Sequence, residues 1–257
     1  MNIETYGTGA RLMWAARLLS ADEGLTEGRH LVLLPIPSTK NKTTVKDTDI
    51  PLSDTLASTD GKSLVVGYSL PPEYKKKATR RGARVLDLSE DESFLSENSY
   101  VSALGAVGYL LTSSKKEPRD MTVGVVGYGR IGKALVRMLL FLGADVRLYT
   151  SKLLTSLELG ECGLESVFVS EWDGSVHDFS GLDIVINTAP KDMTESFPEK
   201  KPSQGMRIIE LASGENFRGI EGVERLPSIP ERMFPESAGK IYADAVIRSL
   251  QFEEDIN

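Results

Sequence analysis

Three glycines mark the place in the sequence where a bound ligand is easiest to position. The run Thr122–Val126 is short, apolar and rich in β-branched residues, and it leads into Gly127-Tyr128-Gly129-Arg130-Ile131-Gly132, which has the spacing G-x-G-x-x-G. In such a turn the first glycine makes the tight bend, the second lets the backbone approach a pyrophosphate, and the third lets helix and strand pack closely. Amides at the start of the following helix then face the anion. The sequence therefore predicts a dinucleotide-binding turn, in which Arg130 either reaches a phosphate or points into solvent.

The segment after the next predicted strand bears on which dinucleotide is bound. Sites for NAD usually place an Asp or Glu about 20 residues beyond the glycines, where it binds the ribose 2′-hydroxyl. No acidic residue occurs between Val146 and Leu157, and the strand ends instead in Thr150-Ser151-Lys152. Two hydroxyls and an ammonium suit a 2′-phosphate, so NADP is favoured over NAD. The alternative for Lys152 is a solvated lysine in a loop.

A third polar segment follows another apolar strand. Asn187-Thr188-Ala189-Pro190 comes directly after Asp183–Ile186, so it should lie at the carboxyl edge of the sheet, where ligands bind. Asn187 and Thr188 could donate hydrogen bonds to a ribose or a carboxamide, and Pro190 would stiffen the loop. The alternative is a polar turn that ends at a proline.

The elements that must hold these segments alternate between strand and helix. Strand, glycine turn, helix (133–142, ending at Gly143) and second strand (145–150) form a βαβ unit. The fold class predicted is α/β, with a Rossmann-type doubly wound parallel sheet preceded by a smaller flavodoxin-like α/β domain. Further strands are expected at 165–169, 183–187, 207–212 and 222–226 downstream, and at 3–6, 31–36, 63–68 and 83–88 upstream, where a helix is expected at 10–19.

The predicted domain organisation has three parts. Residues 1–97 form the smaller domain, which the C-terminal helix within 237–257 completes. Residues 98–118 hold a connecting helix, Ser99–Thr112, and a linker, and residues 119–236 form the dinucleotide-binding domain. Residues 38–60 are polar with little apolar periodicity, so we expect a long loop with one short helix at most.

Composition narrows the function further. The chain has 257 residues and a formal net charge of -7, the wrong sign for gripping nucleic acid. Its longest apolar run is too short to span a membrane, and its start lacks a basic and apolar leader, so we expect a soluble cytoplasmic protein. One cysteine and two histidines argue against a disulfide framework, a Cys/His metal site and most His-based triads. The chemistry is therefore expected to belong to a borrowed cofactor. The basic run Lys75–Arg81 is read as a solvated helix face rather than a docking site.

With these segments in place, the chain resembles the A subunit of dipicolinate synthase. The resemblance covers most of the length and is most specific near the end, in Glu210-Leu211-Ala212-Ser213, Leu226-Pro227-Ser228-Ile229-Pro230 and Pro235-Glu236-Ser237-Ala238-Gly239. The chain departs from the family in lacking a strand and a helix between Gly24 and His30. It also has Ser228 and Glu231 where the family has glycine, and Gly214-Glu215-Asn216 in place of Pro-Gly-Gly.

The resemblance implies an activity and its partners. The family makes the spore acid pyridine-2,6-dicarboxylate, by NADP-dependent oxidation of a dihydro- or hydroxytetrahydro-dipicolinate, with a second, flavoprotein-like B subunit. Such a substrate needs cations or amides for two carboxylates. The predicted substrate residues are Ser38, Thr39, Asn98, Ser99 and Ser237, with Lys40 beside them, and the predicted catalytic residues are Glu236, which could accept a proton, and Ser213.

Two other functions stay open. D-2-hydroxyacid dehydrogenases share the two-domain layout, but they use an Arg and a His where this chain has Ser213 and Glu236, so a carboxylate clamp and a proton donor would be missing. The second alternative is a non-catalytic partner protein that binds NADP. The connecting helix, with its small residues, and the last helix could also form the face of a homo-oligomer.

Overall fold

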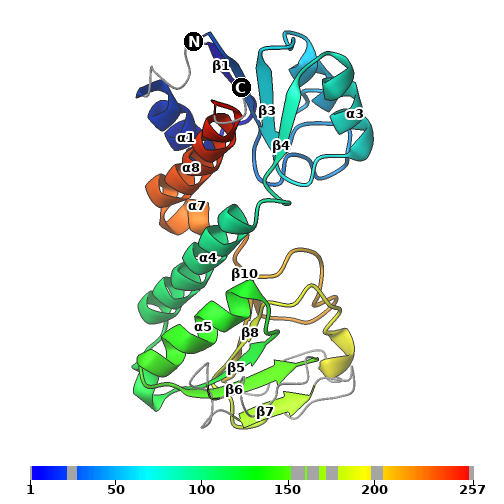
Figure 1. Cartoon of the computed structure of the whole chain (residues 1–257). Coiled ribbons are helices and arrows are strands. Elements are labelled where there is room, and N and C mark those ends of the chain that lie inside the picture. Colours follow the sequence, from blue (N-terminus) through cyan, green and yellow to red (C-terminus); the bar gives the residue numbers. More distant parts are fainter. Residues whose placement is uncertain are drawn as a thin grey trace. The chain divides into compact units, whose positions relative to one another are not determined.

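The structure is a computed structural model, and it describes residues 2–21, 28–151, 160, 168–171, 179–197 and 205–254. The chain forms two compact units (Figure 1). Unit 1 comprises Met1–Val101 and Pro230–Asn257, and unit 2 comprises Ser102–Ile229. The chain passes from unit 1 to unit 2 inside helix α4 (Glu92–Ser113) and returns at the start of helix α7 (Ile229–Met233). A short 3-10 turn, η2 (Pro118–Asp120), precedes the first strand of unit 2.

Unit 2 is built on a six-stranded sheet in which every described pair of strands is parallel. The strands lie in the order β10-β9-β8-β5-β6-β7, which is the doubly wound arrangement of dinucleotide-binding domains. The chain moves outward from β5 to β6 and β7, and later returns to the other side of β5 to form β8. The predicted Rossmann-type sheet is therefore confirmed. The strands are β5 (Thr122–Val126), β6 (Asp145–Thr150), β7 (Phe168–Glu171), β8 (Ile184–Asn187), β9 (Arg207–Glu210) and β10 (Val223–Arg225).

The two faces of this sheet are covered differently. Helix α5 (Arg130–Phe141) and the second half of α4 pack on one face, where Leu135, Leu139 and Ala106 are fully buried against strand residues. The other face carries an aromatic cluster, in which the rings of Phe179 and Phe197 stack with their centroids 5.1 Å apart. The short turn η3 (Thr194–Ser196) belongs to this second face. Burial on both faces explains why the strands read as continuous apolar runs rather than as alternating ones.

Unit 1 contains a smaller parallel sheet in the order β1-β2-β3-β4. A flavodoxin-like sheet has the order 2-1-3-4-5, and removing its second strand leaves the order seen here. This agrees with the prediction that a strand and a helix are missing between Gly24 and His30. Residues 24–27 of that stretch lie outside the described residues. The elements are β1 (Asn2–Thr5), α1 (Ala10–Ala21), β2 (His30–Leu33), η1 (Leu52–Leu56), β3 (Ser63–Gly67), α3 (Pro72–Arg80) and β4 (Arg84–Asp87).

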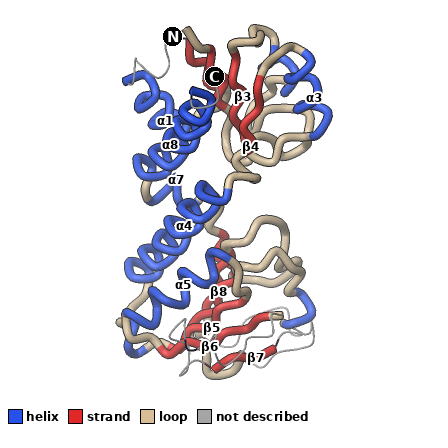
Figure 2. The backbone as a smooth tube through the Cα atoms, viewed as in Figure 1, coloured by secondary structure: helices blue, strands red, loops and turns tan. Residues whose placement is uncertain are grey.

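The last helix belongs to unit 1. Helix α8 (Pro235–Glu254) lies alongside α1 (Figure 2), and a Cβ on Gly239 would collide with the Cβ of Trp14 and crowd the backbone of α1. One turn further on, the buried Tyr242 hydroxyl donates to the carbonyl oxygens of Leu34, at 3.0 Å, and Val66, at 3.2 Å. Both carbonyls lie at the carboxyl ends of neighbouring strands. The helix is therefore held to α1 by close backbone packing and to the sheet by one buried hydroxyl.

Helix α4 begins earlier than the sequence indicated. It starts at Glu92 rather than at Ser99, because the Asp91 carboxylate accepts the amide of Phe94 at 2.9 Å and caps the first turn. The connecting helix predicted at Ser99–Thr112 therefore begins seven residues earlier, and the predicted substrate residues Asn98 and Ser99 do not lie at its start. Both are inside the helix, and Ser99 is buried. Among the described residues, no helix is long and apolar enough to cross a membrane.

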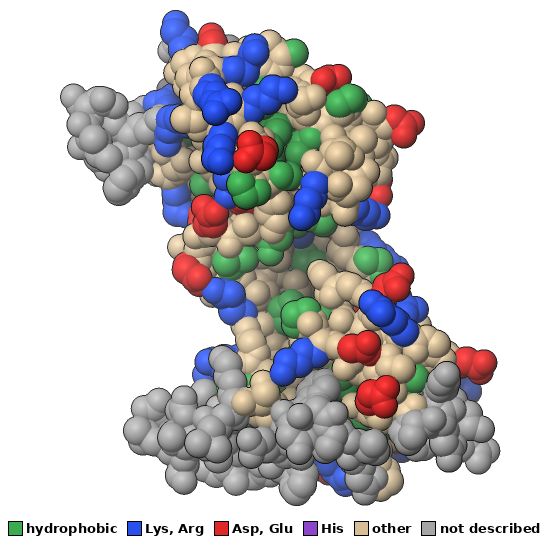
Figure 3. Space-filling view, turned by 90° about the vertical axis from the view of Figure 1, so that its right-hand side faces the viewer, with side chains coloured by type: hydrophobic (Ala, Val, Ile, Leu, Met, Phe, Trp, Pro, Cys, Tyr) green, Lys and Arg blue, Asp and Glu red, His purple; other side chains and the backbone are tan. Residues whose placement is uncertain are grey.

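The basic run 75–81 lies on and just after α3, where acidic partners balance part of its charge. Lys75 Nζ is 2.6 Å from both Asp87 Oδ2 and Glu90 Oε1. Figure 3 shows Lys and Arg side chains gathered on one face of unit 1 with Asp and Glu side chains among them. These contacts favour the interpretation of a solvated helix face.

Gly239 provides a test of the contact between α1 and α8. Gly239→Ala should raise stability by about 1 kcal/mol if helix propensity alone decides. We expect instead a loss of about 1–3 kcal/mol, because the new methyl group would meet the backbone of α1. Urea unfolding measures the difference, and Lys240→Ala, at an exposed neighbouring position, should change stability by about 0.5 kcal/mol or less. A stabilised Gly239→Ala variant would contradict the close contact.

Candidate functional site

The glycine turn closes β5 onto α5 as the spacing predicted. Gly127 has φ +95°, and its amide donates to the carbonyl oxygen of Tyr149 on the neighbouring strand at 2.8 Å. A Cβ at Gly127 would lie 2.7 Å from Thr188 Oγ1, and a Cβ at Gly132 would collide with the carbonyl oxygen of Gly127. Both positions therefore require glycine, and the helix can pack directly on the turn.

Gly129, by contrast, borders open space. A Cβ there would meet no atom within 4 Å, and Gly129 is the N-cap of α5. The first amides of any helix lack partners within the helix and attract anions. A pyrophosphate therefore fits beside Gly129. Arg130 is exposed in the first turn of α5, whereas Tyr128 is buried in the core and Ile131 packs against that core. Of these predicted cofactor residues, Tyr128 and Ile131 could contact a cofactor through their backbone rather than through their side chains.

The end of β6 presents a hydroxyl to solvent and no carboxylate of its own. Thr150 is the last residue of the strand and its side chain is only 2% exposed, whereas Ser151 is exposed. Lys152, the cation predicted for a 2′-phosphate, lies outside the described residues. Of the described pair, Ser151 is thus the side chain placed to meet a ribose substituent.

The loop after β8 uses its polar side chains internally. Asn187 is fully buried, and its amide nitrogen donates to the Ala189 carbonyl oxygen at 2.9 Å while its Oδ1 accepts the Ala189 amide at 3.0 Å. Thr188 Oγ1 donates to the carbonyl oxygen of Val126 at 2.9 Å. Both predicted cofactor side chains are therefore engaged within the protein, Thr188 with the end of β5 and Asn187 with Ala189 and with Glu210 on β9. Their predicted contacts with a ribose or carboxamide stay a prediction. The half-buried Ala189, the exposed Pro190 and the loop backbone remain to line a ligand.

Glu210 is a buried carboxylate that the sequence pattern did not single out as a site residue. It ends β9 with 3% of its surface exposed, accepts the Ala212 amide at 2.8 Å and accepts the Asn187 amide group at 3.1 Å. Burial raises the pKa of Glu210 to about 7, although hydrogen bonds from the Ala212 amide and from Asn216 and Asn187 oppose the rise. The available signal was an acid at the end of the apolar run Arg207–Glu210, a position where an exposed carboxylate is the usual expectation.

The predicted catalytic residues occupy exposed positions in different units. Ser213 follows β9 in unit 2, and Glu236 lies in the first turn of α8 in unit 1, with Ser237 next to it. None of the three is buried or held in a hydrogen-bonded cluster as Glu210 is. Glu236 is therefore not a buried carboxylate at a strand end, as Glu210 is.

The predicted substrate residues of the β2 loop are also committed elsewhere. Ser38 is fully buried, and its hydroxyl accepts the Tyr68 amide at 2.8 Å and donates to the Pro35 carbonyl oxygen at 3.1 Å. Its predicted role in substrate binding is therefore corrected to one of holding the loop. Thr39 donates to Asn41 Oδ1 at 3.2 Å, and Lys40 pairs with Asp47 at 2.7 Å on the surface.

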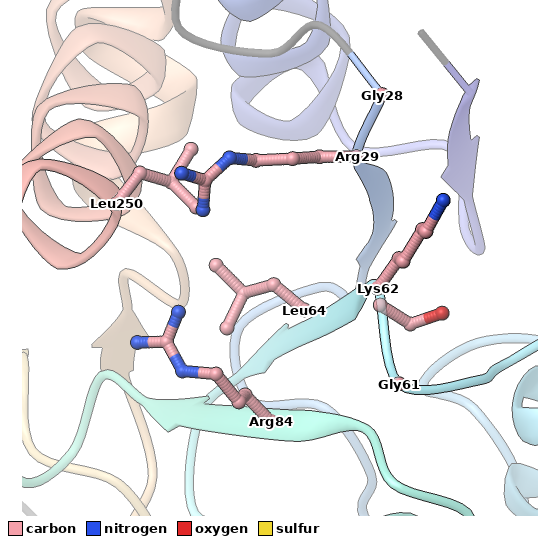
Figure 4. A pocket seen from close by; sticks show the side chains of 8 residues that line it. Gly28, Arg29, Gly61, Lys62, Leu64, Arg84 and Leu250 are labelled. Atoms are coloured by element: carbon pink, nitrogen blue, oxygen red, sulfur yellow. The ribbon is translucent and has the colours of Figure 1, made fainter. Parts of the chain in front are cut away.

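A cavity of about 310 Å³ lies at the opposite, amino edge of the unit 1 sheet (Figure 4). Arg29, Lys62 and Arg84 line it, and burial and the nearby charge of Arg29 lower the pKa of Arg84. Ligands of parallel sheets bind at the carboxyl edge, so this cavity is not part of the candidate site. Within the described ranges, acids, histidines and cysteines form no cluster able to hold a metal ion.

Comparisons with known proteins agree with this geometry. Residues 106–194 match the family model described as D-isomer specific 2-hydroxyacid dehydrogenase, NAD binding domain. The dipicolinate synthase A subunit of Bacillus subtilis (strain 168) is 26% identical over 180 residues, which are 67% of this chain and 60% of that relative's length. The chain is a relative of this A subunit. Within its second unit, residues 106–194 are similar to a nicotinamide-cofactor domain of the dehydrogenase type.

Solved structures show the same fold. The A chain of dipicolinate synthase from Bacillus subtilis superposes with a TM-score of 0.75 at 19% identity, covering 100% of this chain and 98% of that one. The A subunit from Bacillus halodurans gives 0.75 at 20% identity, with 97% of each chain covered. An NAD complex of a D-isomer specific 2-hydroxyacid dehydrogenase from Lactobacillus delbrueckii ssp. bulgaricus gives 0.52 at 14%, covering 99% and 98%. The predicted resemblance and fold class are thus confirmed.

The raised pKa of Glu210 predicts a pH-dependent stability. Because its folded pKa, about 7, exceeds its ordinary value of 4.5, the contribution of Glu210 is fully present below pH 4.5 and is lost as the pH rises through 7. Glu210→Gln removes this loss. We therefore expect the variant to gain roughly 2–3 kcal/mol relative to wild type between pH 5 and pH 8, measured by urea unfolding.

Glu224 supplies the control for this prediction. Arg207 and Tyr109 donate to its carboxylate, and these contacts lower the pKa of Glu224. The contribution of Glu224 is therefore present above pH 4.5, so Glu224→Gln should lose the same stability at both pH values. If the free energy of unfolding of Glu210→Gln differs from that of wild type by the same amount at pH 5 and pH 8, the raised pKa of Glu210 is contradicted.

Proposed function

We propose that this protein is an NADP-dependent oxidoreductase that converts a dihydro- or hydroxytetrahydro-dipicolinate to dipicolinate. The observation that carries the proposal is the glycine turn at the centre of the six-stranded sheet. Gly127 and Gly132 fix the turn, and the open space at Gly129 lies at the start of α5. This is the place where the strand order reverses, and dinucleotides bind there in doubly wound sheets.

The chain's own residues bind and orient the cofactor in this scheme. When bound, NADP would supply the hydride acceptor for oxidation of the dihydro ring, which also loses a proton, and a hydroxytetrahydro substrate would lose water as well. The amides of the first turn of α5 would hold the pyrophosphate, and the backbone of residues 187–190 would border the bound cofactor. Glu210 is a positioning residue, because its carboxylate accepts amides from Asn187 and Ala212. Protonation would remove one of its acceptor positions, so the order of this loop should change near neutral pH.

The choice of NADP rests on the end of β6. No acidic residue follows between Thr150 and Leu157, and the exposed Ser151 stands where an NAD site usually has its Asp or Glu. A hydroxyl followed by a lysine favours a 2′-phosphate over two ribose hydroxyls.

The substrate class is supported by the relationship to the dipicolinate synthase A subunit. The same proposal places the activity in the cytoplasm of a sporulating cell, as a homo-oligomer that works with a flavoprotein-like B subunit. The matching dehydrogenase family model leaves a D-2-hydroxyacid as the second substrate class. It is less favoured because Ser213 and Glu236 stand where that chemistry needs Arg and His.

Cofactor preference is tested by titrating the protein with NADPH and NADH and following the fluorescence of the bound nicotinamide. Wild type should bind NADPH more tightly. Ser151→Asp should weaken NADPH binding about tenfold or more, because a carboxylate would face the 2′-phosphate, and should strengthen NADH binding. Thr194→Asp, at a half-buried position in η3, is the charge-matched control. Tighter binding of NADH by wild type would overturn the assignment of NADP.

Catalysis is tested by following NADPH formation from dihydrodipicolinate, with a D-2-hydroxyacid in a parallel assay. Glu236→Gln separates catalysis from binding, because loss of kcat with unchanged NADPH binding would place this carboxylate at the reacting atoms. Unchanged turnover would remove it from the mechanism. An absence of turnover with every substrate, with or without a B subunit, would favour the non-catalytic NADP-binding alternative.

A further inference from the structure

Arg11 is a buried cation in the first turn of α1. Its side chain is 5% exposed, and among the described residues neither Nε nor Nη1 has a hydrogen-bond partner. Burial lowers the pKa of Arg11, but a guanidinium stays charged at any pH a protein meets. An unpaired buried charge destabilises a fold by several kcal/mol. Arg11 therefore keeps two donors that no group among the described residues satisfies.

The surroundings of Arg11 place it at the ligand-binding edge of unit 1. Helix α1 begins just beyond the carboxyl end of β1. Tyr68, which follows β3, is close enough to raise the pKa of Arg11 against the lowering by burial. Lys46 is near as well, since Arg11 lowers its pKa, although burial lowers it more. Lys46 Nζ donates to the carbonyl oxygen of Ile36, beyond the end of β2, at 2.8 Å. Two cations and a helix start therefore share the edge where parallel sheets bind ligands.

An acidic side chain of unit 1 already lies at this helix start. Glu231 Oε1 accepts the backbone amide of Arg11 at 3.3 Å, and a Cβ on Gly9 would collide with the same carboxylate. The charge of Glu231 also acts on both Arg11 and Lys46. The glycine at position 9 thus leaves room for a carboxylate at the start of α1. Glu231 supplies one, while Nε and Nη1 of Arg11 stay without partners among the described residues.

We propose that Arg11, Lys46 and the start of α1 form a carboxylate-binding subsite, and that Glu231 is an internal carboxylate that competes with a bound one. A planar guanidinium matches a carboxylate with two parallel hydrogen bonds. The occupant is a small carboxylate-bearing molecule, for which an intramolecular carboxylate is a natural competitor. The subsite extends the proposed function, and rests on it, in assigning one carboxylate of a dicarboxylate substrate to unit 1.

The first test replaces the charge of Arg11 with an apolar side chain of similar length. Arg11→Met should weaken the binding of pyridine-2,6-dicarboxylate about tenfold or more, measured by calorimetry without cofactor. The same variant should melt a few degrees higher without ligand, because an unpaired buried charge is removed. A merely structural arginine would give the opposite shift. Arg17→Met, on the same helix at an exposed position, should leave binding within about twofold.

The second test removes the competitor. Glu231→Gln keeps an acceptor for the Arg11 amide but not the charge, so pyridine-2,6-dicarboxylate and pyridine-2-carboxylate should both bind more tightly, by about fivefold or more. Glu73→Gln, an exposed acid in α3, is the matched control. Pyridine itself should not bind to any variant.

The outcomes separate this subsite from the proposed function. Tighter binding by Glu231→Gln and weaker binding by Arg11→Met support the subsite even where no turnover of dihydrodipicolinate is seen. Undetectable binding of both acids to wild type and to Glu231→Gln at millimolar concentration overturns it. Equal binding by Arg11→Met and wild type, or weaker binding by Glu231→Gln, also overturns it, whatever the dinucleotide measurements give.

Discussion

The cofactor site of unit 2 depends on the close backbone approach between the carbonyl of Gly127 and Gly132. Because no side chain separates the turn from the helix, α5 begins immediately beyond β5 with its first amides directed at the space beside Gly129. Any Cβ at Gly132 would push the helix away from the strand and would turn those amides away from the ligand. The anion site is thus a product of packing: sterics require Gly127 and Gly132, whereas Gly129 borders the open space.

A second interaction ties the neighbouring strands to that turn. Asn187 and Glu210 are directly paired in register across β8 and β9, and their side chains are hydrogen bonded in a place that water barely reaches. Thr188 then bonds to the end of β5. The three strand ends that border the cofactor position are therefore linked by side chains, which leaves little freedom for the loop after β8. The consequence is a carboxylate that is hard to ionise, as its raised pKa indicates.

Patterns that rest on backbone sterics can be predicted from sequence, whereas the partners of individual polar side chains cannot. The glycine spacing, the β-branched runs and the return of the last helix can be recognised in the amino-acid sequence. Polar residues at strand ends often bind ligands, so the sequence predicts that role for Asn187, Thr188 and Ser38, yet each bonds to a backbone atom of its own unit. Such choices depend on distances of about 3 Å between atoms, whether the partner is a near neighbour in the chain, as for Asn187 and Ser38, or lies on another strand, as for Thr188. Asp91 shows the same limit, since its capping of α4 starts the helix at Glu92 rather than at the predicted Ser99.

The chain has only two histidines and one cysteine, and two of its buried ionisable side chains are instead an acid and an arginine. Each unit keeps an ionisable side chain almost fully buried at the carboxyl edge of its sheet: Glu210 in unit 2 and Arg11 in unit 1. Their situations differ, because Glu210 can become neutral near pH 7 whereas Arg11 cannot lose its charge. Glu210 can therefore offset its burial by taking up a proton, and hydrogen bonds to strand ends satisfy it. Arg11 has no such route. The charge of Glu231 opposes the effect of burial, but the Glu231 carboxylate bonds to the Arg11 backbone amide, and Nε and Nη1 of Arg11 have no partner among the described residues. The fold itself therefore accounts for the buried acid, whereas the unpartnered donors of the arginine are the reason for proposing a ligand there.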